Sequence, residues 1–371
     1  MSDKAQRALF EVYFRRNPRG GGFTVLGGID EALQLFEEYG IDCDAWAVKS
    51  GTPVFPGEPV FAVEGKPDEL LPVVHGVLCR LRTASAVMTV QARLKLAAGN
   101  ARVAMPQSEE TRRCFDASVF VRCWAGEEQA FAALCAKYKN GCVLPVDTYS
   151  TLKKGVPAAI AALAANAPNS AALYISSGDI AYQAIHARRM LDEAGLENCA
   201  IYAGGQLDEF VIRDIMRQGA PIDLFCVDRL PACNEFIASL AVSQAQGKPR
   251  MTYSQNTAKI TPPGKKQLWR LLSSDGKALA DVLAREDEVL PNGEEYTLFD
   301  PHQTWKRKEV TGYTAVPLLC KVVPGESEQG SSEEGLDCLW DEVLRFENPH
   351  KYYVDYSRPL WDLFRECMDA G

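Results

Sequence analysis

The fold is decided by residues 143–227, in which four short β-rich runs recur at a regular spacing. The runs are Val143-Leu-Pro-Val146, Leu173-Tyr-Ile175, Ala200-Ile-Tyr202 and Leu224-Phe-Cys-Val227. Helical apolar patterns fill the intervals, so a new strand is expected every 24–30 residues. Strands that alternate with helices at this spacing are typical of a parallel sheet with right-handed crossovers. The sequence therefore predicts an α/β fold.

The same pattern extends in both directions from this stretch. Residues 102–105 and 118–121 are also β-rich, which brings the predicted strands to six. A complete α/β barrel has eight strands, so the pattern fits an open doubly wound sheet or an incomplete barrel. In both, ligands bind at the carboxyl ends of the strands. Helices are expected at 127–138, 156–164, 180–194, 209–218 and 232–245.

The chain divides into three zones of different character. Residues 1–99 mix strand and helix patterns, residues 100–247 carry the strand–helix alternation, and residues 248–371 are charged, aromatic and strand-like. A hydrophilic segment at 325–335 is expected to be a solvated loop. In the first zone we expect a strand at 10–14 and helices at 31–39 and 72–98.

Composition limits the class of protein. Of the 371 residues, 47% are hydrophobic and 24% are charged, which excludes a disordered or fibrous chain. The formal net charge of −9 argues against broad nucleic-acid binding, which needs a positive field. We expect a cytoplasmic protein without membrane attachment, because no secretion signal or apolar run of ~20 residues is evident. The twelve cysteines lack Cys-x2-Cys spacing, so most are expected to be reduced core residues and no metal site is predicted.

Small polar residues and glycines follow all four runs of the 143–227 stretch. They are Asp147, Ser176-Ser177-Gly178-Asp179, Gly204-Gly205 and Asp228-Arg229. Exposed N–H groups at the start of the following helices would form an anion-binding rim. Asp147 and Asp179 are candidate ligands for a metal or for ribose hydroxyls. The alternative is that these residues serve only as turns and helix caps.

Arg15 and Arg16, after the predicted strand at 10–14, are a second candidate phosphate contact, and a solvated strand edge is the alternative. The four histidines have no partner nearby in the sequence, and no Ser/His/Asp or Cys/His arrangement is evident. The residues alone therefore predict a cytoplasmic α/β protein with a candidate anion-binding rim.

Several long motifs resemble those of nicotinate phosphoribosyltransferases of the bacterial type, in the family's order and over nearly the whole chain. They are Phe14-Arg-Arg-Asn-Pro-Arg-Gly-Gly-Gly-Phe23, Gly51-Thr-Pro-Val-Phe-Pro-Gly-Glu-Pro59, Val146-Asp-Thr-Tyr-Ser-Thr-Leu-Lys-Lys-Gly-Val-Pro157, Ser177-Gly-Asp179, Lys259-Ile-Thr-Pro-Pro-Gly264, Phe299-Asp-Pro-His-Gln-Thr-Trp-Lys-Arg307 and Phe346-Glu-Asn-Pro-His-Lys-Tyr-Tyr-Val-Asp355.

The resemblance implies a fold and a reaction. The fold is an N-terminal α/β sandwich over 1–99, an irregular and incomplete α/β barrel over 100–247, and a C-terminal segment over 248–371 that returns to the sandwich. A head-to-tail dimer is implied, either with a second copy or with a full-length relative. The family joins nicotinate to phosphoribosyl pyrophosphate, giving nicotinate mononucleotide and pyrophosphate, with Mg²⁺ and with ATP hydrolysis through a phosphohistidine.

The chain departs from the family's motifs where those motifs carry charge or chemistry. Ser118 falls at the position of the phosphorylated histidine, so it is the degenerate catalytic position. Tyr174 and Ser176 replace an arginine and an aspartate, Asp228 replaces a glycine of the phosphate turn, and a strand–helix unit after residue 105 is missing. The substrate contacts that the resemblance retains are Arg15, Arg16, Arg112, Arg113, Asp147, Ser177, Asp179, Gly204 and Gly205.

Two hypotheses follow from these departures. Each lost charge-assisted contact to phosphate costs roughly 1.5–3 kcal/mol. The losses together, with repulsion from Asp228, cost on the order of 5 kcal/mol, which is more than a thousandfold in affinity. One hypothesis is a working nicotinate phosphoribosyltransferase of NAD salvage. The alternative is a catalytically silent paralogue that binds a metabolite or acts as a regulatory or interaction subunit.

Overall fold

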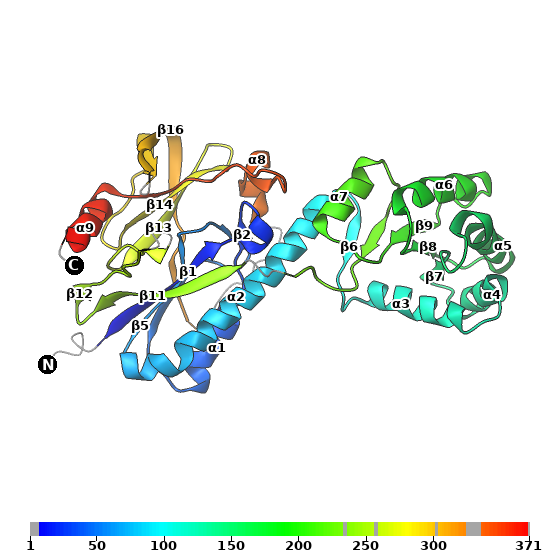
Figure 1. Cartoon of the computed structure of the whole chain (residues 1–371), viewed down its shortest axis with the longest axis horizontal. Coiled ribbons are helices and arrows are strands. Elements are labelled where there is room, and N and C mark those ends of the chain that lie inside the picture. Colours follow the sequence, from blue (N-terminus) through cyan, green and yellow to red (C-terminus); the bar gives the residue numbers. More distant parts are fainter. Residues whose placement is uncertain (1–6, 233–235, 256–258, 301–302, 324–334, 370–371) are drawn as a thin grey trace. The chain divides into compact units, whose positions relative to one another are not determined.

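A computed structural model describes residues 7–232, 236–255, 259–300, 303–323 and 335–369. The chain forms two compact units, which are treated separately below. Residues Val90–Ala232 form one unit, and the segments on either side of them in the sequence form the other. Figure 1 labels the helices and strands of both.

The unit Val90–Ala232 contains a five-stranded parallel sheet in the order β6-β10-β9-β8-β7. Its helices α4, α5, α6 and α7 alternate with the strands at the predicted places. The strands are β6 (Arg102–Ala104), β7 (Cys142–Pro145), β8 (Ala171–Ile175), β9 (Ala200–Ala203) and β10 (Leu224–Cys226), and the helices are α4 (Glu127–Lys137), α5 (Val156–Asn166), α6 (Ile180–Glu193) and α7 (Glu209–Arg217).

The strand predicted at 118–121 is wrong, because these residues belong to the helix α3 (Glu109–Arg122). Ser108 caps the helix by accepting the N–H of Thr111, and two glutamates lie in the first turn, where they favour the helix dipole. The buried residues Thr111, Cys114, Ala117 and Val121 recur at helical spacing. This helix start outweighs the β propensity of the Val119-Phe-Val121 run.

The sheet of this unit is an incomplete barrel. Within Val90–Ala232, all of which the structure describes, β6 pairs only with β10 and β7 pairs only with β8, so the sheet does not close between β6 and β7. The helix α3 packs against β7 and β10 instead. Its Cys114 Sγ lies 3.3 Å from Cys226 Sγ of β10, and the Thr111 hydroxyl donates to the carbonyl of Ala104 at the end of β6. One helix thus occupies the interval where the missing strand–helix unit was expected.

The other unit is an α/β sandwich built on antiparallel sheets. Its main sheet has the order β12-β11-β1-β5-β3-β17, and a second has the order β15-β16-β13-β14-β18, in which only β18 runs parallel to its neighbour. Its elements are β1 (Ala8–Arg16), β2 (Thr24–Val25), α1 (Ile29–Glu38), β3 (Asp44–Ala47), β4 (Pro53–Val54), β5 (Pro59–Gly65), the part of α2 (Pro67–Ala98) up to Thr89, β11 (Ile237–Ala245), β12 (Lys248–Pro249), β13 (Lys266–Leu272), β14 (Ala278–Arg285), β15 (Gly293–Asp300), β16 (Gln303–Pro317), β17 (Cys320–Val322), α8 (Asp341–Leu344), β18 (Val354–Tyr356) and α9 (Arg358–Asp369).

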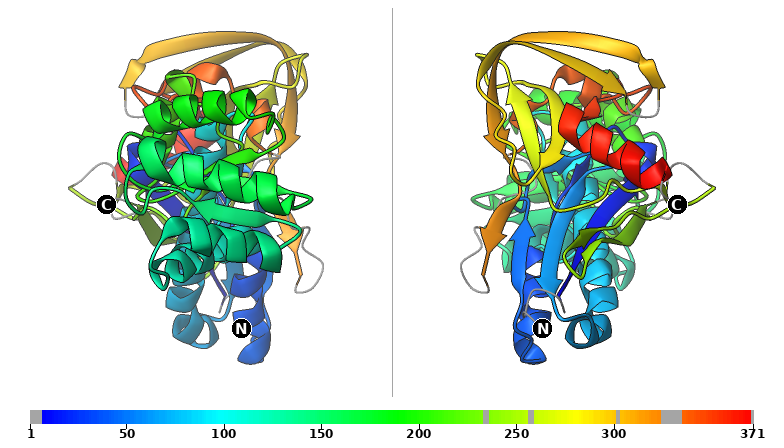
Figure 2. Two further views of the ribbon diagram at one scale, coloured as in Figure 1. Left: turned by 90° about the vertical axis from the view of Figure 1, so that its right-hand side faces the viewer. Right: turned by 90° about the vertical axis from the view of Figure 1, so that its left-hand side faces the viewer.

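Segments far apart in the sequence build this sandwich. The central strand β1 pairs with β5 on one side and with β11 on the other. The helix predicted at 232–245 is therefore wrong from residue 237 onward, because β11 there completes the sheet against β1. The small residues of β11 suit a strand as well as a helix, so its pairing with β1 decides which structure forms. The helix α9 packs against β14, and the right-hand view of Figure 2 shows it in red.

The helix α2 is long and apolar enough to cross a membrane by length and composition alone, and it is the one such helix among the described residues. Core helices of soluble proteins share this property. Its residues Leu70, Val73, Val77 and Leu81 are buried in the hydrophobic core of the sandwich. The Thr89 hydroxyl accepts the N–H of Val25 at 2.9 Å. These contacts account for the apolar character of α2 within the fold.

The cysteines that the structure describes are all reduced. Five of them, Cys114, Cys135, Cys142, Cys199 and Cys226, are buried, and all five belong to the unit Val90–Ala232. Cys123 and Cys320 are exposed, so the predicted core role holds for only part of the set. The solvated loop expected at 325–335 lies outside the described residues except for Gly335.

Candidate functional site

The residues that follow β7, β8, β9 and β10 form the carboxyl edge of the parallel sheet, and this is where we place the candidate site. Asp147, directly after β7, is half-buried. Its Oδ2 accepts hydrogen bonds from the Ser176 N–H at 2.8 Å, the Ser176 hydroxyl at 3.0 Å and the Ser177 hydroxyl at 2.8 Å. One carboxylate oxygen therefore fixes the loop between β8 and α6.

Asp179 lies in the same loop and caps a helix. Its Oδ1 accepts the N–H of Tyr182 at 3.0 Å at the start of α6. The preceding Gly178 has a φ of +75°, a conformation that favours glycine. In this structure Asp147 holds the turn and Asp179 caps the helix.

The two glycines after β9 lie against other parts of the edge. A Cβ atom on Gly204 would fall 1.9 Å from the Tyr174 hydroxyl, and one on Gly205 would fall 2.4 Å from the carbonyl oxygen of Ser176. Tyr174 is only 8% exposed, so its ring fills the space above Gly204. Burial raises the pKa of the Tyr174 hydroxyl above its ordinary value, so the hydroxyl stays neutral.

The three candidates on α3 face different surroundings. The Ser118 hydroxyl donates to the carbonyl of Cys114 at 2.8 Å, a bond within the helix. Arg113 pairs with Glu109 one turn earlier and lies over Gly141, whose Cβ would fall 2.2 Å from its Nη1. Arg112 is exposed. In this arrangement Ser118 has no nucleophile-activating base among its hydrogen-bond partners.

Arg15 and Arg16 belong to the sandwich unit. The Arg15 Nε donates to the Ser239 hydroxyl at 2.7 Å, and its guanidinium lies 4.9 Å from the centre of the Tyr13 ring. Burial lowers the pKa of Arg15. Arg16 is exposed at the end of β1. Arg16 therefore lies at the exposed end of a central strand and not at a sheet edge, while Arg15 is tied to β11.

The sequence analysis missed Glu127 near the carboxyl edge. It begins α4, is 7% exposed, and its Oε1 has no hydrogen-bond partner among the described residues. Burial raises the pKa of this carboxyl, and a hydrogen bond from the Tyr149 backbone opposes the shift. A glutamate in the first turn of a helix is common, so no sequence signal marked it.

The described residues do not fit a protein-held metal. No group of three His, Cys, Asp or Glu side chains is placed to share an ion. The described hydrogen bonds of Asp147 hold the loop after β8, and that of Asp179 caps α6. A divalent cation needs several oxygen ligands at one place. We therefore derive no reaction step through Mg²⁺ at these residues.

Comparison with known proteins agrees with this architecture. The nicotinate phosphoribosyltransferase C-terminal domain model matches residues 265–364, and the quinolinate phosphoribosyl transferase N-terminal domain model matches residues 4–85. Nicotinate phosphoribosyltransferase from Bacillus subtilis is 27% identical over 96% of this chain and 89% of its own length. The enzyme of the same name from Dictyostelium discoideum is 26% identical over 96% of this chain and 83% of its own length.

Solved structures show the same fold. Human nicotinic acid phosphoribosyltransferase superposes with a TM-score of 0.74 at 20% identity, covering 98% of this chain and 96% of that one. Nicotinate-nucleotide pyrophosphorylase from Pyrococcus furiosus gives 0.63 at 18% identity, covering 98% and 89%. The Bacillus alignment spans 439 positions, more than the 371 residues of this chain, so the relative carries segments that this chain lacks. The chain therefore resembles nicotinate phosphoribosyltransferases over nearly its whole length and lacks segments that its Bacillus relative carries.

Proposed function

We propose that the chain is a catalytically silent nicotinate phosphoribosyltransferase paralogue that serves NAD salvage as a metabolite-binding or regulatory subunit. The observation that carries this proposal is the Tyr174 ring above Gly204. A glycine after a strand leaves room for phosphate to approach backbone N–H groups. Here a buried, neutral hydroxyl occupies that room, so a phosphate would have to displace it.

The scarcity of histidines in the parallel-sheet unit also supports the proposal. The unit Val90–Ala232 is fully described, and its one histidine is His186 on α6. The His186 ring packs edge-on against Tyr182, with 4.2 Å between ring centres. A phosphorelay needs a nucleophilic nitrogen at the reacting phosphate. Ser118, at the family's histidine position, instead bonds to its own helix.

The second candidate is a working nicotinate phosphoribosyltransferase that uses Mg²⁺ and ATP. It is favoured by the gathering of Asp147, Ser177, Gly204 and Gly205 at one edge of the sheet. In this case Arg112 and Arg113 would hold nicotinate, and a second subunit of a homodimer, or a full-length relative in a mixed dimer, would complete the site.

Isothermal titration with phosphoribosyl pyrophosphate and Mg²⁺ separates the two candidates. The proposal predicts that phosphoribosyl pyrophosphate binds with a Kd in the millimolar range or weaker. It also predicts that nicotinate causes no release of pyrophosphate, with or without ATP. Submillimolar binding together with nicotinate-dependent pyrophosphate release would overturn it. Tyr174→Ala tests the carrying observation, because removing the ring should improve binding, while the exposed Tyr182→Ala on the same unit should not.

A regulatory role needs a second measurement. The chain is mixed with a full-length nicotinate phosphoribosyltransferase from the same organism, and the mass of the complex and the rate of nicotinate mononucleotide formation are followed. A mixed dimer with a changed rate supports a regulatory subunit. If the rate is unchanged and no mixed complex forms, the regulatory part of the proposal is excluded.

A further inference from the structure

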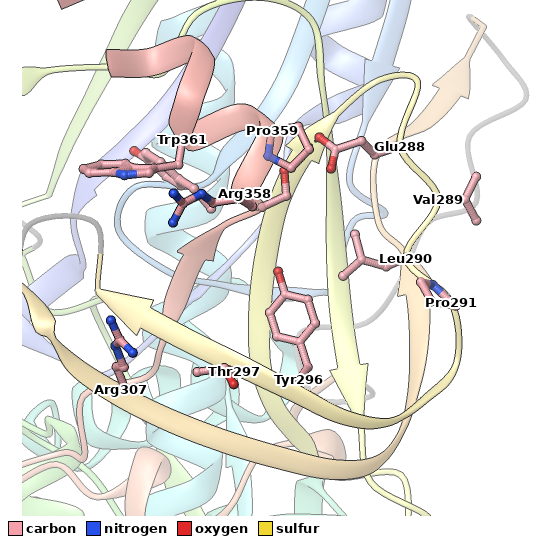
Figure 3. Close-up of a pocket in the computed structure, with 12 residues that line it drawn as sticks. Glu288, Val289, Leu290, Pro291, Tyr296, Thr297, Arg307, Arg358, Pro359 and Trp361 are labelled. Carbon is pink, nitrogen blue, oxygen red and sulfur yellow. The ribbon is translucent and has the colours of Figure 1, made fainter. Parts of the chain in front are cut away.

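The sandwich unit contains a cavity lined by residues of its C-terminal segment. Its volume is about 560 Å³, within the range of about 300–1,000 Å³ that is typical of small-molecule sites. Its walls are the loop 288–291, the hairpin of β15 and β16, and the start of α9 (Figure 3). All of these elements lie in the region matched by the nicotinate phosphoribosyltransferase C-terminal domain model.

Two cations from separate elements line this cavity. Arg307 comes from β16 and Arg358 from the first position of α9. In Figure 3, Arg307 and the hydroxyl of Tyr296 extend from the hairpin toward the side on which Arg358 lies. The two guanidinium groups create a positive wall that suits an anion.

One carboxylate, Glu288, lines the cavity, and a second, Asp362, lies beside Arg358. Glu288 Oε1 accepts the N–H of Arg285 at 2.7 Å and the hydroxyl of Ser357 at 2.8 Å. Asp362, one turn further along α9, lies 3.4 Å from Arg358 Nε, and both side chains of this pair are exposed. An exposed pair of this kind is weak. A multiply charged anion can therefore compete with Asp362 for Arg358.

The cavity also has aromatic walls. Trp361 lines it one turn beyond Ser357, and its ring is stacked on Phe364 with 5.4 Å between ring centres. Tyr296 and Tyr356 line it as well. An indole supported from behind by another ring is a suitable surface on which a planar heterocycle can stack. A site for phosphate alone would not need these rings, and a site for a neutral ring would not need two arginines.

We propose that this cavity binds a nucleoside phosphate, with its phosphates between Arg307 and Arg358 and its base against Trp361. The site lies wholly within the sandwich unit, so it goes beyond the proposed function and does not depend on whether the carboxyl edge of the parallel sheet is active. It gives the chain a way to sense a nucleotide without transforming it.

The test is isothermal titration of the full chain with ATP, AMP, adenosine and inorganic pyrophosphate. ATP and AMP are expected to bind, and adenosine and pyrophosphate are each expected to bind at least tenfold more weakly. Arg307→Ala and Arg358→Ala should each weaken ATP binding at least tenfold. Arg285→Ala is the matched control, because Arg285 pairs with Asp287 in the same unit and does not line the cavity.

A variant expected to bind more tightly removes the ambiguity of a folding defect. Asp362→Asn takes away the carboxylate that competes for Arg358, so ATP affinity should rise severalfold and its salt dependence should become steeper. Unchanged ATP affinity in both arginine variants overturns the site. Equal binding of pyrophosphate and ATP, with no effect of Trp361→Ala, overturns the assignment to a nucleoside.

Discussion

Gly204→Ala tests directly whether Tyr174 fills the carboxyl edge of the parallel sheet. The added Cβ would lie 1.9 Å from the Tyr174 hydroxyl and 2.5 Å from two ring carbons, so the ring must move. Forcing extra volume into a packed site costs about 1–3 kcal/mol. Gly204 does not have a positive φ, so the backbone itself adds no penalty of the kind that left-handed glycines impose.

A double-mutant cycle isolates the clash. In a Tyr174→Leu background the hydroxyl and the far ring atoms are absent, so Gly204→Ala should cost almost nothing, and the coupling should be about 1–3 kcal/mol. Gly126→Ala is the control, because nothing lies within 4 Å of its Cβ position and its φ is −156°. This change at a helix N-cap should cost less than about 1 kcal/mol.

Hydrogen exchange of the β8 and β9 amides, with urea unfolding of the whole chain, measures these free energies for the unit concerned. The reasoning is refuted if Gly204→Ala is as mild as Gly126→Ala in the otherwise unchanged chain. Tyr174 would then leave its place at little cost, and the observation that carries the proposed function would lose its force.

Three further predictions concern stability. Burial, and then the charge of Asp281, raises the pKa of Glu58 well above 4.5. The stabilising contribution of Glu58 is therefore present at low pH and is lost as pH rises through the folded pKa. Glu58→Gln should flatten the pH dependence of the unfolding free energy above pH 4.5, as measured by urea titration. The Glu209 carboxylate lies 3.0 Å from Arg93 Nε, and both side chains are buried. Arg93→Met removes this cation and should lower the unfolding free energy in urea by about 3–5 kcal/mol. The double variant Arg93→Met, Glu209→Leu should recover most of this loss. Gly155→Ala brings a Cβ to 1.9 Å from a backbone carbonyl, which cannot rotate away, so it should cost about 3 kcal/mol or more and lower the melting temperature further than Gly204→Ala.

The regular strand–helix spacing predicted the parallel sheet well, because each unit there is local. The strands β7, β8, β9 and β10 and the helices between them lie where apolar periodicity placed them. The two errors share a cause. Residues 118–121 and 237–245 have patterns that suit either a helix or a strand, and contacts with distant segments decide between them.

The candidate site was predicted less completely than the fold. Asp147, Ser177, Gly204 and Gly205 do gather at one edge, as expected from residues that follow neighbouring parallel strands. The position of the Tyr174 ring over Gly204 depends on side-chain packing across two strands, and no spacing rule predicts it. The hydrogen bonds of Asp147 to two serines are likewise visible only once the loop is folded.

The pairing of β1 with β11 has a consequence for synthesis on the ribosome. Ala8 pairs with Ala245, so 237 residues separate partners in one sheet. At about 5–20 residues per second, β1 emerges roughly 10–50 s before its neighbour exists. During that time the parallel-sheet unit is synthesised and can fold. The core side chains Phe10 and Phe14 of β1 are not yet buried, because β11 has not been made. Chaperone binding to the unpaired β1 is therefore expected to govern how much of the protein reaches its native state in a growing cell.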